Sequence, residues 1–82
     1  MRVNLQINNR HLNNLTFSEA LELADHYYAI HGDSPTTIID VSTNKVVNEF
    51  QIEGSQRWYT FEELIELSYY KVIEVVDSRL IS

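Results

Sequence analysis

Two nine-residue segments of this chain are close to identical: Thr16–Ala24 and Thr60–Ser68 share five residues at an offset of 44. Each segment contains a Thr-x-x-Glu capping box, in which the threonine oxygen accepts from the third helical N–H and the glutamate accepts from the N–H of the threonine. Each therefore predicts the start of a helix. The offset divides the 82 residues into two similar halves, at about residues 1–42 and 45–82.

Length and composition favour one small domain that acts inside the cell. The chain has 82 residues and no cysteine, so neither disulfides nor a thiolate zinc site can support its core. Apolar packing or a partner subunit must then supply the stability. No apolar run approaches the roughly 18 residues of a membrane span, and the N-terminal residues lack the apolar segment of a signal peptide. We therefore expect a soluble, cytoplasmic protein without a membrane partner.

In the first half, the sequence predicts a strand, a loop, a helix and a second strand. Apolar and polar residues alternate over residues 3–7, as in a half-buried strand. Residues 8–15 are rich in asparagine, which is typical of turns, so we expect a loop there. From Phe17 the apolar residues follow the helical period, and Gly32 ends the helix before Pro35. β-Branched residues over 36–41 predict the second strand.

In the second half, the same order is expected. Residues 46–52 predict a third strand, with Val46, Phe50 and Ile52 on one side, and residues 42–45 form a hairpin turn with Asn44 in the left-handed conformation. The second helix extends from Phe61 to about Tyr70. Residues 71–77 are rich in valine and isoleucine and predict a fourth strand.

The order βαββαβ predicts an α+β fold of the ferredoxin-like plait type. In this fold a four-stranded antiparallel sheet of order 4-1-3-2 carries both helices on one face. The first strands of the two halves also agree, with Leu5-Gln6-Ile7 matching Phe50-Gln51-Ile52. Duplication and convergent capping chemistry both explain this likeness, and the fold argument needs only the element order. The alternative is a longer second helix over a three-stranded sheet.

Motifs for catalysis, metals and cofactors are not found in the sequence. His26 and His31 lie about 140° apart around a helix axis, and His11 has no identifiable partner, so we expect no metal site. Gly32 and Gly54 stand alone, which excludes glycine-rich phosphate loops and dinucleotide fingerprints. There is no cysteine or Gly-x-Ser-x-Gly nucleophile. We expect a protein that is not an enzyme and needs no cofactor.

The charge of the chain argues against direct contact with nucleic acid. Twelve acidic and six basic residues give a net charge of −6, which repels phosphates. The predicted outward positions of the central strands also lack the aromatic and basic residues that bind RNA in plaits. An acidic surface on the first helix is expected from Glu19, Glu22 and Asp25.

A second group of residues, around the second helix, combines acidic and aromatic side chains. Rings of this kind supply rigid apolar area, and carboxylates steer a basic partner. The simpler interpretation is that the carboxylates lie on solvated helix faces and that Trp58 and one tyrosine complete a thin core. The candidate protein-binding residues are Trp58, Tyr59, Glu62, Glu63, Glu66, Tyr69 and Tyr70.

From these residues we expect a small acidic interaction domain that binds a basic protein. One form of this function is inhibition by charge mimicry, in which the carboxylates occupy a groove meant for nucleic-acid phosphates; small acidic domains of phages and mobile elements often work this way. The alternative is a ligand-sensing regulatory domain that acts as a homodimer.

Overall fold

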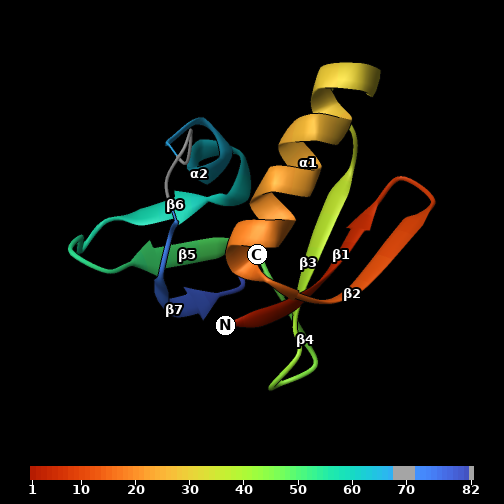
Figure 1. Cartoon of the computed structure of the whole chain (residues 1–82). Helices are drawn as coiled ribbons and strands as arrows, with labels where there is room; N and C mark the ends of the chain where they lie inside the picture. Colours follow the sequence, from red (N-terminus) through yellow and green to blue (C-terminus); the bar gives the residue numbers. More distant parts are fainter. Residues whose placement is uncertain (68–71, 82) are drawn as a thin grey trace.

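The computed structural model describes residues 1–67 and 72–81, which form an α+β structure with two helices and two antiparallel sheets (Figure 1). The first sheet has the order β2-β1-β3-β4. Its strands are β2 (Arg10–Thr16), β1 (Arg2–Ile7), β3 (Thr36–Asp40) and β4 (Lys45–Val47). Every pair of neighbouring strands in this sheet is antiparallel.

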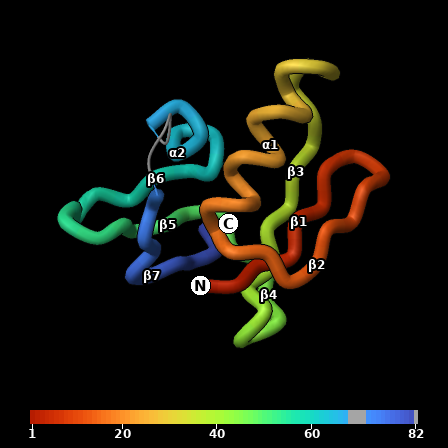
Figure 2. The backbone as a smooth tube through the Cα atoms, in the orientation of Figure 1, coloured from red at the N-terminus to blue at the C-terminus, as the bar shows by residue number. Residues whose placement is uncertain are grey.

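The second sheet is smaller and has the order β6-β5-β7. Its strands are β6 (Trp58–Thr60), β5 (Glu49–Ile52) and β7 (Val75–Arg79), again paired antiparallel. Only Asn48 separates β4 from β5, so the chain passes directly from the first sheet into the second (Figure 2).

Both predicted capping boxes are formed, and each starts a helix. Helix α1 (Phe17–His31) follows Thr16, whose Oγ1 accepts from the Glu19 N–H at 3.1 Å while Glu19 Oε1 accepts from the Thr16 N–H at 2.8 Å. Helix α2 (Phe61–Leu67) follows Thr60, which exchanges the same two bonds with Glu63, at 3.2 and 3.0 Å. The prediction of two helix starts is confirmed.

The C-terminal end of α1 also agrees with the sequence. Gly32 has a φ of 78°, which side chains other than glycine rarely adopt, and its N–H donates to the Tyr28 carbonyl at 2.8 Å. The hairpin turn after β3 likewise has Asn44 in the left-handed region, at a φ of 57°.

The two halves of the chain have the same topology. The first runs β1-β2-α1-β3 and the second β5-β6-α2-β7; in each, the first strand lies between the other two. Strand β4 has no counterpart among the described residues of the second half and extends the first sheet. Figure 1 shows each helix close to the sheet of its own half. The repeated capping box therefore sits at the same place in two similarly connected units.

This arrangement differs from the single four-stranded sheet of the predicted plait. In the plait, the first strand would pair with the third and fourth predicted strands. Here β2 and β3 occupy the two edges of β1, so the C-terminal strand β7 pairs with β5 instead. The α+β class is confirmed, and the sheet order 4-1-3-2 is replaced by two sheets.

The prediction of a loop over residues 8–15 was wrong. The chain turns at Asn8 and Asn9, with Asn8 at a φ of 52°, and returns as β2, in which Arg10 lies opposite Ile7. Asn14, at a φ of 58°, lies where the register shifts, and its N–H donates to Asn4 Oδ1 at 2.9 Å. Asparagine thus forms the turn and the bulge of a hairpin.

The predicted strand over residues 46–52 is divided in two, and this division changes which side chains are buried. Val46 was expected on the same side as Phe50, but Val46 is 42 % exposed while Val47 is buried. The break at Asn48 reverses the alternation, so that Val47 packs in the core from β4 and Phe50 from β5.

The C-terminal predictions are only partly covered by the structure. The expected helix end near Tyr70 lies outside the described residues, as does Lys71 at the start of the fourth strand predicted over residues 71–77. A strand is present in this region, but it spans Val75–Arg79.

The core is one cluster that spans both halves. It contains apolar residues of both sheets and both helices, and the rings of Phe17, Phe50 and Phe61 meet at its centre. Among the described residues, neither helix has the length and apolar character needed to cross a membrane.

Candidate functional site

The two aromatic residues before α2 lie on opposite faces of the second sheet. Tyr59 is the cross-strand partner of Phe50, and Trp58 is the partner of Gln51. Because successive side chains of a strand alternate, Tyr59 lies on the core side with Phe50, and Trp58 lies on the outer face. The structure therefore separates two residues that the sequence analysis placed in one surface.

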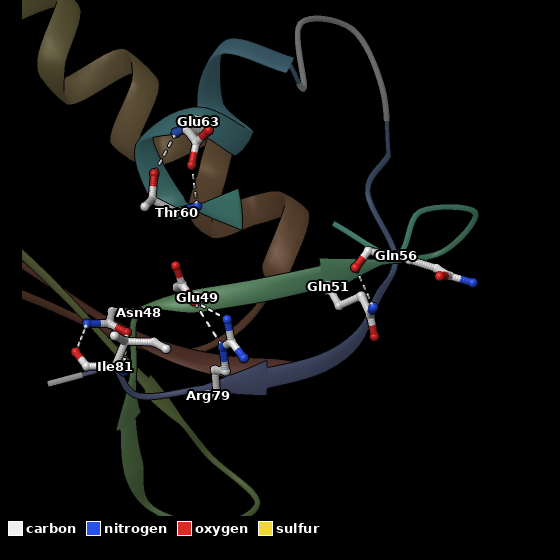
Figure 3. A network of polar contacts seen from close by, with 8 residues as sticks. All are labelled: Asn48, Glu49, Gln51, Gln56, Thr60, Glu63, Arg79 and Ile81. Carbon is white, nitrogen blue, oxygen red and sulfur yellow. Dashed lines mark hydrogen bonds and ion pairs between the residues drawn. The ribbon is translucent and has the colours of Figure 1, made fainter. Parts of the chain in front are cut away.

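Tyr59 forms part of a small polar group at the start of α2. The Arg57 guanidinium lies 4.9 Å from the centre of the Tyr59 ring, and Arg57 Nη2 lies 2.8 Å from Glu63 Oε2. The other oxygen of Glu63 accepts from the Thr60 N–H (Figure 3). The Thr60 bonds, chiefly its backbone N–H, together with the Arg57 charge hold the pKa of Glu63 below its ordinary value. Both oxygens of the Glu63 carboxylate are thus occupied by contacts at the start of α2.

Trp58 forms a separate group on the outer face. Arg79 lies over its ring at 4.0 Å from the centroid, and Arg79 Nε and Nη2 donate to Glu49 Oε1 at 2.9 and 2.8 Å. The register explains the pair of Glu49 and Arg79, because these residues lie opposite each other on β5 and β7 (Figure 3). One face of the tryptophan is therefore covered by an arginine that a carboxylate holds in place.

Sequence reasoning missed Arg57, Glu49 and Arg79 as parts of these groups. Arg57 precedes the aromatic pair directly and could have been included on proximity alone. Glu49 and Arg79 lie on two other strands that are separated from Trp58 in the sequence. Only the pairing of β5 with both β6 and β7 brings them to Trp58.

The remaining predicted residues of the second helix divide into two sets. Glu62 and Glu66 are exposed on α2, where Phe61, Leu64 and Ile65 face the core. Tyr69 and Tyr70 lie outside the described residues. For this part of the predicted surface, the structure therefore shows two carboxylates on one exposed side of α2.

The acidic residues predicted on α1 are all exposed, but they differ in their contacts. Glu19 closes the first capping box and lies 3.8 Å from Arg2 Nη1; the Thr16 bonds, that of the backbone N–H first, and the Arg2 charge lower its pKa. Glu22 and Asp25 are exposed, and neither forms an ion pair with a described residue. Glu19 and Glu22 also line an open depression of about 380 Å³ with Leu23 and His26.

Asp25 lies on the side of α1 that faces the second half of the chain. Ser18, one end of this side, exchanges hydrogen bonds with the Ile73 backbone at 3.3 and 3.5 Å. Tyr28, the other end, has its pKa raised, first by burial and further by the nearby carboxylates of Glu62 and Asp33, against the opposing hydrogen bond with Thr36. Residues 18, 21, 25 and 28 share one helix side, so Asp25 lies along α1 between these two contacts.

Within the described residues, no three histidine or carboxylate side chains are placed to hold a metal ion. Comparisons with protein-family models, with curated proteins and with solved structures found no match to this chain. The case for a function therefore rests on the residues themselves.

Proposed function

We propose that this chain is a non-enzymatic domain that binds a basic protein through an acidic helical surface, formed by Glu22 and Asp25 of α1 and Glu62 and Glu66 of α2. One observation supports this choice. The three ion pairs among the described residues use Glu19, Glu49 and Glu63. The four carboxylates of the acidic helical surface are exposed and form no ion pair with a described residue.

The proposal narrows the set of residues that the sequence suggested. Glu19 and Glu63 satisfy backbone N–H groups at the two helix starts, so a partner could recruit them only by weakening the caps. The carboxylates of the acidic helical surface make no such bond among the described residues. They can pair with a partner's lysine or arginine residues without a loss inside the domain.

The form of this function that we favour is inhibition by charge mimicry. Carboxylates on two adjacent helices present negative charge in the way that phosphates do, and the chain's own charge of −6 repels nucleic acid. The partner would be a nucleic-acid-binding protein, and phages and mobile elements are the proposed source of such an inhibitor. These partners act in the cytoplasm, where the proposal places this protein.

Affinity capture with the tagged full chain from the lysate of its host tests this proposal. The variant Glu62→Lys/Glu66→Lys should lose a basic partner that the wild type retains. The matched control is Glu53→Lys/Glu74→Lys, which makes the same change in net charge at two exposed carboxylates outside the surface. Equal retention by both variants, or equal loss, would contradict the assignment of the surface.

A further inference from the structure

Strand β7 is the edge of the second sheet, and its extended backbone continues beyond the strand. It pairs with β5 on one side, and the sheet order β6-β5-β7 leaves its other side without a partner strand among the described residues. In Figures 1 and 2, β7 lies on the side of β5 away from β6, with the N-terminus near the end of the strand. The Asn48 side chain then donates to the Ile81 carbonyl at 3.0 Å and accepts from the Ile81 N–H at 2.9 Å (Figure 3). We call residues 75–81 the β7 edge.

The backbone N–H of Ser78, at the centre of the β7 edge, makes a local hydrogen bond. Ser78 lies opposite Phe50, but its N–H donates to the carboxylate of the adjacent Asp77, at 2.8 Å. A local bond of this kind can satisfy a backbone N–H without a partner strand. The edge thus presents a backbone group that another strand could bind.

The side chains around Ser78 are complementary to a reversed copy of themselves. Asp77 and Arg79 flank the serine with opposite charges, and Val76 and Leu80 flank these two, each 59 % exposed. In an antiparallel pair of two copies centred on Ser78, each Asp77 lies opposite Arg79 of the other copy. Each Val76 then lies opposite Leu80. Opposite charges and apolar pairs at facing positions both stabilise antiparallel strands.

Arg79 keeps a donor for this contact. Its Nε and Nη2 bind Glu49, while its Nη1 has no hydrogen-bond partner in the part of the chain that the structure describes. A guanidinium can donate five hydrogen bonds, so Nη1 can bind Asp77 of a second copy when the guanidinium turns from the Trp58 ring toward the open edge of β7.

A depression beside the strand accommodates the apolar end of the pair. It has a volume of about 510 Å³, and Val76 lines it with Met1 and Val41, which are 37 % and 40 % exposed. Because Leu80 of the second copy lies directly opposite Val76, its side chain reaches this depression. The register shift at Val76, where β7 has one residue more than β5, limits the new ladder to residues 76–80.

We propose that two copies of this chain associate by antiparallel pairing of their β7 edges, centred on Ser78 and held by reciprocal Asp77–Arg79 ion pairs. The acidic helical surface takes no part in this contact, so dimerisation and the binding of a basic protein succeed or fail separately. A five-residue ladder is smaller than a standard protein interface, so the dimer is a weak one.

Sedimentation velocity on the full chain, from about 10 μM to about 1 mM, tests the proposal over the range expected for a small interface. The weight-average mass should rise from 9.6 kDa toward twice that value. Asp77→Arg places like charges opposite each other at two positions and should raise the dissociation constant about tenfold or more. Asp77→Arg/Arg79→Asp restores opposite charges across the pair and should restore the dimer.

Two further variants keep the test decisive. Glu53→Arg makes the same charge change at an exposed carboxylate away from the edge and should dimerise like the wild type. Leu80→Lys, outside any strand, should prevent dimerisation even if the substitutions within β7 disturb the fold. A wild type that stays at 9.6 kDa at the highest concentration would overturn the proposal, leaving the edge to a strand of another protein. An Asp77→Arg variant that dimerises normally would overturn it too.

Discussion

The rings of Phe17 and Phe61 meet edge to face, with their centroids 5.9 Å apart and their planes at 85°. Each is the first residue of its helix, so the contact joins the same position of the two halves. Phe50 completes the cluster, at 4.7 Å from Phe17 and 6.4 Å from Phe61. The repeated Thr-Phe-x-Glu segment thus starts both helices and supplies two of the three rings that hold the halves together.

Replacement of Phe50 by alanine should therefore unfold both halves together. Phe50 is fully buried, and such a truncation costs about 3–5 kcal/mol, a large part of the stability of a small domain. Hydrogen exchange of the wild type and Phe50→Ala would measure the loss along the chain. Protection that survives in α1 and β1 of the variant would show that the halves are independent. Val46→Ala, at an exposed position, is the control.

Loss of either helix cap should destabilise the domain by a similar amount. Thr16→Ala and Thr60→Ala each remove the acceptor for one N–H of the first turn, and such changes cost about 1 kcal/mol. Urea denaturation should show both effects, with Thr43→Ala in the exposed hairpin turn as a control that changes little. A Thr60→Ala variant as stable as the wild type would indicate that α2 does not depend on its capping box.

The two capping glutamates should make stability depend on pH in the acid range. Both have a pKa below the ordinary value of 4.5 in the folded chain, so each contributes stability above that pH. This contribution is lost as the pH falls through the lower folded pKa. The Tm of the wild type should therefore drop below about pH 4.5, and that of Glu19→Gln/Glu63→Gln should drop less. Parallel curves for the two proteins would contradict this origin of the acid sensitivity.

The features that the sequence predicted correctly are those determined locally. The caps at Thr16 and Thr60, the helix end at Gly32 and the left-handed Asn44 depend on residues within a few positions. β2 was missed because asparagine has a low strand propensity. Its bulge is held instead by a bond from the Asn14 N–H to Asn4 on the neighbouring strand.

The site could be predicted in part for the same reason. Exposure of Glu22, Asp25, Glu62 and Glu66 follows from the helical period, and it is confirmed. The opposite orientations of Trp58 and Tyr59 follow from β6, a strand that the sequence analysis did not predict. The position of Arg79 over Trp58 depends on the pairing of β5 with β7, which no local pattern encodes.

Removal of the Glu49 carboxylate should release Arg79 from the face of Trp58. This partly exposed ion pair contributes about 1 kcal/mol, so the main effect of Glu49→Ala should be spectroscopic rather than thermodynamic. Trp58 is the single tryptophan, and its fluorescence should become more accessible to an aqueous quencher. Glu53→Ala, near the end of the same strand, should leave quenching unchanged. Equal quenching of Glu49→Ala and the wild type would mean that Arg79 stays on the ring without its carboxylate.

The central claim is that the acidic helical surface binds a basic protein, and the salt dependence of that affinity tests it most directly. Isothermal titration calorimetry of the captured partner, between about 50 and 300 mM NaCl, should show the affinity of the wild type falling by tenfold or more, because salt screens exposed charges. Glu62→Lys/Glu66→Lys should bind weakly at every concentration, and Glu53→Lys/Glu74→Lys should follow the wild type. An affinity that does not change with salt, or that survives reversal of Glu62 and Glu66, would contradict the account.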